Sequence, residues 1–307
     1  MHDMLPKKDI NLISLLLKSK ESTLMTMLNK YLEDTYGKHN VFRRGNDFVY
    51  ATGEIPVLMV AHLDTVLPQP PEQLYVSPNR RVWMNPSTGI GADDRAGVYA
   101  IMKILKSGRR PSVLFTTGEE SGGLGAMAFV KEFAEPPVPT KYVIEIDRRG
   151  RGQAVYYDCG NTKFEQYITE AGFVTHQGVF SDISFICPDW NVAGVNVSAG
   201  YYDEHTTAEQ LNVDDLFYTI ECVEKLLDKA EEVEFYLFEP IPKVKAFYAK
   251  CHICGTHYPT FSMTKVGNDN ICIGCTEIFI NWCEECGKPF YGLTPEDKKC
   301  EVCADVV

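Results

Sequence analysis

The sequence lacks any uninterrupted apolar run long enough to cross a bilayer. It also lacks a small-residue cleavage site near its N-terminus, where the apolar spacing over residues 9–36 predicts amphipathic helix rather than a signal peptide. Positive charge is scarce, since 30 Lys and Arg stand against 42 Asp and Glu, a formal net charge of -12. Because an acidic surface repels nucleic-acid phosphates and anionic membranes, we expect neither as a partner. Paired CxxC spacing without a secretion signal predicts a reducing compartment, so we expect a cytoplasmic location.

Cysteine is sparse except at the end of the chain. Of eleven Cys, three (Cys159, Cys187 and Cys222) are scattered and are interpreted as small buried hydrophobes. The other eight form four CxxC pairs, which without a secretion signal indicate metal binding rather than disulfides. Separations of 17 and then 13 residues predict two Cys₄ zinc sites, paired sequentially or cross-braced. The predicted ligands are Cys251, Cys254, Cys272, Cys275, Cys283, Cys286, Cys300 and Cys303.

The chain of 307 residues is long enough for one medium domain and one small domain. We predict a first domain at 1–232, a Pro-containing linker at 233–249 and a zinc module at 250–307. The module repeats itself weakly, as CHICGTHYP and then CEECGKPFY. Its role is either structural, because metal stabilises so small a fold, or docking to a protein partner. Seven Lys and no Arg against eight Asp and Glu in residues 240–307 disfavour nucleic acid, and Phe279, Ile280 and Trp282, expected to be exposed, favour protein contact.

Strand and helix patterns alternate along the predicted first domain. Apolar runs at 55–61, 112–117 and 142–146 are typical of strands covered on both faces, and helical patterns at 94–105 and 124–133 separate them. The alternation predicts an α/β three-layer sandwich with a largely parallel sheet. The other predicted elements are strands at 41–44, 47–51, 154–157 and 192–197, a hairpin at 74–77 and 80–84, and helices at 162–171 and 213–227.

Metal-binding residue types stand where these strands end. In parallel sheets, ligands bind at the edge where the strands' carboxyl ends meet. A hydrolytic zinc pair requires a bridging carboxylate, further N and O ligands, and an unbound carboxylate that accepts the proton of a water molecule. The candidates are His62, Asp64, Asp93, Asp94, Glu119, Glu120, Asp147 and His205.

Each candidate also has a purely structural interpretation. Asp93 and Asp94 could cap a helix, and Asp147 could pair with Arg148 or Arg149. Those two arginines could instead hold a substrate carboxylate. The recurrence of ligand types at successive strand ends favours the metal site.

Five segments carry a specific resemblance: AHLDTV (61–66), GADDRAG (91–97), TTGEESGGLGA (116–126), EID (145–147) and GYYDEHTTAEQ (200–210). In this order they resemble the motifs of the co-catalytic di-zinc exopeptidase superfamily, which includes aminopeptidases, tripeptidases, carboxypeptidases and aminoacylases. The resemblance covers about residues 10–230.

The resemblance implies a role for each matching residue. Asp93 is expected to bridge two zinc ions, with His62 and Asp147 completing one site and Glu120 and His205 the other. Glu119 is expected to act as general base and Asp64 to orient His62. A cis peptide between Asp93 and Asp94 is also implied.

The expected function is therefore hydrolysis of a peptide bond near a chain end, with two catalytic Zn²⁺ ions, for which Co²⁺ or Mn²⁺ could substitute, and two structural Zn²⁺ ions. The substrate is expected to be a small peptide or an acyl-amino acid. Two alternatives stay open: an N-acyl-amino-acid deacylase or amidase at the same site, and an inactive hydrolase fold that binds proteins through its zinc module. Because only about fifty residues separate Asp147 from His205, we expect no inserted lid domain.

Overall fold

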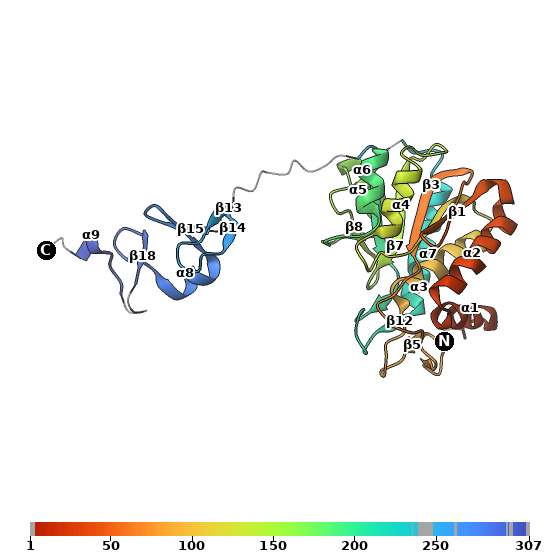
Figure 1. Ribbon diagram of the computed structural model, residues 1–307, viewed down its shortest axis with the longest axis horizontal. Coiled ribbons are helices and arrows are strands. Elements are labelled where there is room, and N and C mark those ends of the chain that lie inside the picture. Colours follow the sequence, from red (N-terminus) through yellow and green to blue (C-terminus); the bar gives the residue numbers. More distant parts are fainter. Residues whose placement is uncertain are drawn as a thin grey trace. The chain divides into compact units, whose positions relative to one another are not determined.

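The computed structural model describes residues 4–234, 236–238, 248–260, 263–292, 294 and 297–304. The chain divides into two compact units, Met1–Pro240 and Ile241–Val307 (Figure 1). We call them the first domain and the zinc module.

An eight-stranded mixed sheet forms the centre of the first domain, in the order β1-β2-β6-β3-β7-β10-β8-β9. The four middle strands are mutually parallel, so that their carboxyl ends meet at one edge. They are β6 (Pro111–Thr116), β3 (Ile55–His62), β7 (Tyr142–Arg148) and β10 (Gly194–Ser198). The outer strands are β1 (Val41–Arg44), β2 (Phe48–Ala51), β8 (Gln153–Val155) and β9 (Val174–Thr175).

Helices cover both faces of this sheet. Along β3, Val57 and Met59 pack into one core while Leu58 and Val60 pack into the other, as the two-residue period of a strand requires. In Figure 1, α2 and α4 lie on opposite sides of β3. The first core contains α1 (Lys7–Lys18), α2 (Glu21–Tyr36), α3 (Ala92–Lys106), α5 (Thr162–Glu170) and α7 (Val213–Asp228), and the second contains α4 (Leu124–Glu132) and α6 (Ile183–Trp190). The predicted three-layer α/β sandwich is confirmed.

Two helical segments differ from the sequence prediction. The N-terminal pattern forms two helices, because Ser19 adopts an extended conformation between them; the second ends at Gly37 as predicted. Helix α6 was not predicted. Its sequence, ISFICPDW, is apolar on most sides and contains Pro188, so it shows no helical period.

The predicted hairpin is confirmed as β4 (Tyr75–Val76) and β5 (Val82–Met84). It belongs to a second, four-stranded sheet with β12 (Gln210–Asn212) and β11 (Tyr201–Tyr202). This small sheet anchors both ends of the segment that carries His205.

Residues 149–204 are all described and form β8, α5, β9, α6, β10 and β11. Every one of these elements belongs to a sheet of the first domain or packs on its cores. The segment therefore contains no lid domain, as expected.

Part of the segment predicted as a linker, 233–249, packs on the first domain. Tyr236 is only 8% exposed, and its ring lies against those of Tyr142, Phe164 and Tyr167. Its backbone N–H donates to the Lys141 carbonyl, and its own carbonyl accepts from the N–H of Ala193. The first domain therefore extends beyond residue 232. Residues 239–247 of the predicted linker lie outside the described residues.

These contacts predict the result of two truncations. A chain that ends at residue 240 should keep the stability of the first domain, whereas one that ends at residue 234 should lose about 3 kcal/mol, because it removes a buried aromatic side chain. Urea unfolding of both chains measures the difference. Equal free energies of unfolding would show that the Tyr236 contacts contribute nothing.

Within its described residues, the zinc module forms three two-stranded hairpins and two short helices. The hairpins are β13 (Tyr248–Lys250) with β14 (His257–Pro259), β15 (Met263–Val266) with β16 (Asp269–Cys272), and β17 (Ile280–Trp282) with β18 (Pro289–Tyr291). The helices are α8 (Ile273–Phe279) and α9 (Glu301–Ala304). The Tyr291 hydroxyl donates to Asp269 and so joins the two Cys-rich halves.

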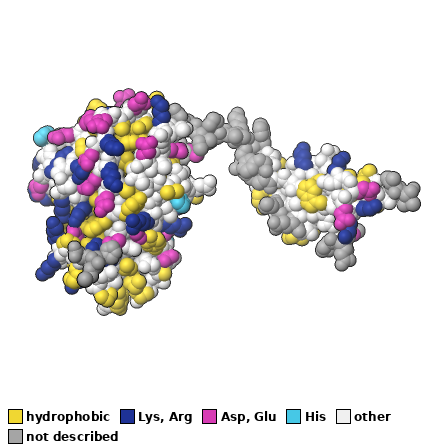
Figure 2. Space-filling model, turned by 180° about the vertical axis from the view of Figure 1, so that it is seen from behind, with side chains coloured by type: hydrophobic (Ala, Val, Ile, Leu, Met, Phe, Trp, Pro, Cys, Tyr) yellow, Lys and Arg dark blue, Asp and Glu magenta, His cyan; other side chains and the backbone are white. Residues whose placement is uncertain are grey.

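The surface of the first domain is of mixed charge. Figure 2 shows Lys and Arg side chains interspersed with Asp and Glu over one face. Among the described residues, no helix has both the length and the apolar character to cross a membrane.

Candidate metal centre

His62 ends β3 and is fully buried. Its Nε2 atom lies 3.1 Å from Oδ1 of Asp93, in the first turn of α3, and 3.5 Å from Oδ1 of Asp147, near the end of β7. These three side chains come from three elements that meet at the carboxyl edge of the sheet. We call them the first metal set.

His205 lies between β11 and β12 with a positive φ of 62°. Its Nε2 atom lies 3.1 Å from Oδ2 of Asp93 and 3.0 Å from Oε1 of Glu120, which follows β6. We call His205, Glu120 and Asp93 the second metal set. Asp93 thus presents one carboxylate oxygen to each imidazole, which is the arrangement that a carboxylate bridging two metal ions requires.

The donor types of both sets fit zinc. Catalytic zinc sites use three protein ligands and leave one position open. Each metal set supplies three such ligands, one imidazole nitrogen and two carboxylates, and the Asp93 carboxylate belongs to both sets. Ligand atoms of His62, Asp93 and Glu120 all lie within 4.8 Å of one another. The same donors also accept Co²⁺ and Mn²⁺.

The electrostatics of the site point the same way. Burial, followed by the negative charge of Asp93, raises the pKa of Glu120 to about 7 and of Asp147 to about 6. A hydrogen bond with Asp93 raises the pKa of His205 to about 9. Crowded carboxylates that resist ionisation, beside imidazoles that keep their protons, indicate a site built for additional positive charge.

Glu119 follows β6 beside the metal ligands. Its Oε2 atom lies 4.0 Å from Nε2 of His62, and burial, with the negative charge of Asp147 adding to it, raises its pKa to about 8. Glu119 is therefore a carboxylate near the first metal set that neither set requires as a ligand.

Asp64 contacts both His62 and the Glu119–Glu120 turn. Its carboxylate accepts the backbone N–H groups of Glu119 at 3.2 Å and Glu120 at 3.1 Å, and Oδ1 lies 3.3 Å from Nδ1 of His62. A donor–acceptor contact at Nδ1 leaves Nε2 free to face the metal set. Asp64 therefore contacts the His62 ring through its main-chain carbonyl, 3.1 Å from Nδ1, as well as through its side chain, and its carboxylate positions the main chain of Glu119 and Glu120.

Asp94 lies behind the site and is fully buried. It accepts the N–H groups of His62 and Gly97, and burial raises its pKa well above the ordinary value. The peptide between Asp93 and Asp94 is cis, as expected. A Cβ atom on Gly97 would lie 2.0 Å from the Ile146 carbonyl, so α3 can pack directly on β7 only with glycine there.

The contacts of Asp147 differ from the structural alternative. It accepts hydrogen bonds from the hydroxyls of Tyr201, at 3.1 Å, and Ser181, at 3.2 Å. Arg149 pairs instead with Glu204, and Arg148 donates to Gln153. Tyr201 and Ser181 were not singled out from the sequence. Neither residue type is a typical metal ligand, and only the fold shows that both hydroxyls contact Asp147.

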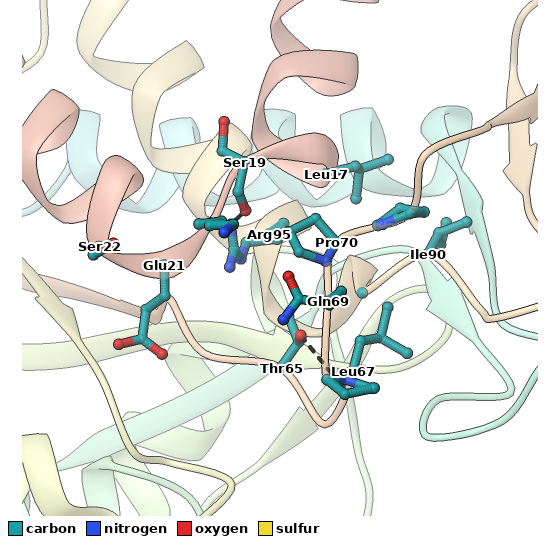
Figure 3. Close-up of a pocket in the computed structure, with 14 residues that line it drawn as sticks. Leu17, Ser19, Glu21, Ser22, Thr65, Leu67, Gln69, Pro70, Ile90 and Arg95 are labelled. Atoms are coloured by element: carbon teal, nitrogen blue, oxygen red, sulfur yellow. Dashed lines mark hydrogen bonds between the residues drawn. The ribbon is translucent and has the colours of Figure 1, made fainter.

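A pocket of about 320 Å³ lies beside the site, between the α1–α2 junction and the loop after β3 (Figure 3). Thr65 directly follows Asp64, and Arg95 is buried with its guanidinium donating to the carbonyls of Leu16 and Ser19. Burial, reinforced by Asp64, raises the pKa of Glu21 on the pocket wall. The pocket thus has both polar and apolar lining residues, the latter including Leu17, Leu67, Pro68, Pro70 and Ile90.

The eight Cys of the zinc module gather sequentially. Within each group of four, all sulfur atoms lie within 4.8 Å of one another. The groups are Cys251, Cys254, Cys272 and Cys275, and Cys283, Cys286, Cys300 and Cys303. The structure thus favours two tandem sites over the cross-braced arrangement.

The two halves of the module use the same loop. Gly255 N–H donates to the Cys251 carbonyl, and Gly287 N–H donates in the same way to Cys283. Backbone N–H groups of Cys300 and Cys286 lower the pKa of the Cys283 thiol to about 6, whereas side-chain hydrogen bonds with the same two residues raise the pKa of Cys303 to about 12.

One expectation for the module surface is wrong. Phe279 and Trp282 are exposed, at 45% and 58%, but Ile280 is buried and packs beside Ile271 in the small core of the module. Side chains alternate between the two faces of a strand, so Ile280 and Trp282, two residues apart on β17, share a face. Ile280 reaches the small core on that face, whereas Trp282, at the end of the strand, does not belong to it.

Part of the first domain resembles a known peptidase family in sequence, and the domain resembles solved structures in fold. Residues 48–188 match peptidase family M28. No curated protein matches the sequence. Among solved structures, an aminopeptidase PepT from Bacillus cereus ATCC 10987 is 16% identical, with a TM-score of 0.56, over 74% of this chain and 100% of that one. A tripeptidase from Staphylococcus aureus subsp. aureus Mu50 is 14% identical, with a TM-score of 0.60, over 75% and 100%.

A TET aminopeptidase from Thaumarchaeota archaeon SCGC AB-539-E09 is also 14% identical, with a TM-score of 0.59, over 74% of this chain and 99% of that one. At these identities the likeness shows a shared fold. The family match adds the sequence signal across β2 to α6, the region that carries four of the five proposed catalytic metal ligands. Residues 48–188 thus resemble peptidase family M28 in sequence, and the first domain shares the fold of these aminopeptidase and tripeptidase structures.

Proposed function

We propose that this chain is a zinc-dependent exopeptidase that binds two metal ions at the shared Asp93 and hydrolyses a peptide bond near a chain end. The observation that carries the proposal is the position of the Asp93 carboxylate, with one oxygen 3.1 Å from each of the two imidazoles. The aminopeptidase and tripeptidase names of the similar structures support a peptide substrate with a free N-terminus.

The metal ligands and the base have separate tasks in this proposal. When bound, the two ions would supply Lewis acidity to the attacking water and to the substrate carbonyl. His62 and Asp147 would hold one ion, Glu120 and His205 the other, and Asp93 both. Glu119 accepts the proton of the attacking water and later donates it to the departing amine.

Asp64 positions both the metal ligand His62 and the general base Glu119. By fixing the His62 ring and the backbone of Glu119 together, it sets the distance between a metal ligand and the general base. Because it acts through His62 and through the backbone of Glu119 and Glu120, we assign Asp64 the role of a positioning residue.

Residues 149–204 contribute no lid domain over the site. We therefore propose that the site itself, rather than an inserted domain, selects short substrates. The zinc module is proposed to bind two structural Zn²⁺ ions and, through Phe279 and Trp282, to contact a protein partner.

A panel of substrates tests the reaction class. The proposal predicts turnover of an unblocked tripeptide, a strong loss when its N-terminus is acetylated, and little loss when its C-terminus is amidated, with zinc, cobalt or manganese present in turn. Preferential turnover of acyl-amino acids would instead establish the deacylase. If only C-terminal amidation abolishes turnover, the enzyme is a carboxypeptidase rather than an aminopeptidase.

A further inference from the structure

Glu209 occupies a concave nest of main-chain N–H groups at the start of α3. Its Oε2 atom accepts from Ile90 at 2.9 Å and Gly91 at 2.7 Å, and its Oε1 atom accepts from Ala92 at 2.8 Å and Asp93 at 3.2 Å. The residue is only 3% exposed. Four successive N–H groups therefore converge on one buried carboxylate.

The backbone is shaped for this contact. Gly89 and Gly91 both have positive φ, at 75° and 65°, which turns the N–H groups inward. A Cβ atom on Gly89 would lie 2.7 Å from the Thr206 carbonyl and 3.1 Å from Glu209 itself. The loop before α3 thus lies directly against the segment that carries Glu209.

These dipoles offset part of the cost of burying the Glu209 carboxylate, although burial still raises its pKa above the ordinary value. N–H groups at a helix start lack partners within the helix, and a carboxylate there is favoured by the helix dipole. Burying a carboxylate without such partners would be costly. Charge-assisted hydrogen bonds are roughly twice as strong as neutral ones, so the four contacts form a rigid clamp.

The clamp joins two ligands of the second metal set. Asp93 is bound through its own N–H, and His205 precedes Glu209 by four residues on the same segment. The residue after Glu209, Gln210, begins β12 and pairs with Met84 of β5, so the segment is anchored on the small sheet. The path from Asp93 to His205 through Glu209 is therefore short and fixed.

We propose that Glu209 is a positioning residue that holds Asp93 and His205 in metal-binding geometry before the ion arrives. This inference rests on the proposed function, because it takes Asp93 and His205 as ligands. It predicts an effect on metal affinity rather than on the chemical step.

The test is metal titration of the full chain. The two Cys₄ sites are first filled with zinc, the labile ions are removed with a mild chelator, and Co²⁺ is added in competition with a chromophoric chelator. In Glu209→Gln, the side chain keeps its shape, but one carboxylate oxygen is replaced by an NH₂ group. That group faces two backbone N–H donors and cannot accept their hydrogen bonds. Substituting a group that supports a metal ligand typically costs 10- to 100-fold in affinity, and we expect about that loss for the second metal set.

Two further readouts separate positioning from general destabilisation. At saturating Co²⁺ the variant should recover turnover to within a few-fold of the wild type, since no ligand or base is missing. Asp9→Asn is the matched control: Asp9 is also buried, at 4% exposed, and pairs with Lys103 at the far end of α3, so its loss should lower stability with unchanged Co²⁺ affinity.

Wild-type Co²⁺ affinity in Glu209→Gln, with a loss of stability like that of Asp9→Asn, would overturn the proposal. If Glu209→Gln does not fold, Glu209→Asp is tested instead, because it keeps the carboxylate but moves it one methylene away from the four N–H groups. Unchanged Co²⁺ affinity in Glu209→Asp would also overturn the proposal. Failure of the wild-type chain to bind Co²⁺ outside the Cys₄ sites would instead refute the proposed function, and the inference with it.

Discussion

Glu119→Gln is expected to keep both catalytic metal ions and to lose most of its turnover. The change removes the carboxylate that accepts the proton of the attacking water, while the ligands of both metal sets stay in place. General acid–base groups typically contribute about 10²- to 10⁴-fold, and kcat should fall within that range. KM for an unblocked tripeptide should change little, because the amide occupies the same volume.

The neighbouring residue supplies the matched comparison. Glu120→Gln removes a charge from the second metal set, since Oε1 of Glu120 lies 3.0 Å from Nε2 of His205. That variant should lose metal first, and added metal should restore part of its turnover. If Glu119→Gln loses metal and Glu120→Gln does not, the two assignments are exchanged.

Asp93→Ala is expected to lose both catalytic ions together. One side chain faces both imidazoles, so its removal leaves each metal set with two protein ligands. Because altering a group that merely supports a ligand costs 10- to 100-fold, removal of the shared ligand should lower turnover by more than about 100-fold. Elemental analysis after zinc reconstitution should find four ions per wild-type chain and two in the variant, both in the Cys₄ sites.

Single-site variants distinguish a bridge from a simple ligand. Asp147→Ala should weaken only the first metal set and Glu120→Ala only the second, so each chain should retain three ions. If Asp93→Ala also retains three, Asp93 serves one ion only, and the sharing inferred from its two oxygens is incorrect.

The elements that position the site could be predicted because their signals are local. The run that forms β3 is apolar throughout, since helices cover both of its faces, and it ends at His62. Asp93 and Asp147 were recognisable for the same reason: each directly adjoins a strongly patterned element. The resemblance to a known superfamily, rather than any local pattern, indicated which of these side chains would come together. The roles of the ligands stay proposals.

Other features depend on contacts between distant segments. Glu209 lies within a motif that the sequence displays, yet its partners are backbone N–H groups more than 100 residues away, which no side-chain pattern reveals. Helix α6 is short and apolar on most sides, so burial hides its period. Tyr236 follows acidic residues in a stretch that has the composition of a linker, and only the aromatic surface provided by Tyr142 and Phe164 explains why it packs.

The central claim is that two ions held around Asp93 make this chain a peptidase. The most direct test is a zinc titration of chain whose Cys₄ sites are filled and whose labile ions have been removed, with hydrolysis of an unblocked tripeptide followed at each addition. The account predicts no turnover at the start, a rise as up to two further equivalents of zinc bind, and the loss of that rise in Asp93→Ala. Two equivalents bound without hydrolysis of any peptide, or equal hydrolysis before zinc is added, would contradict it.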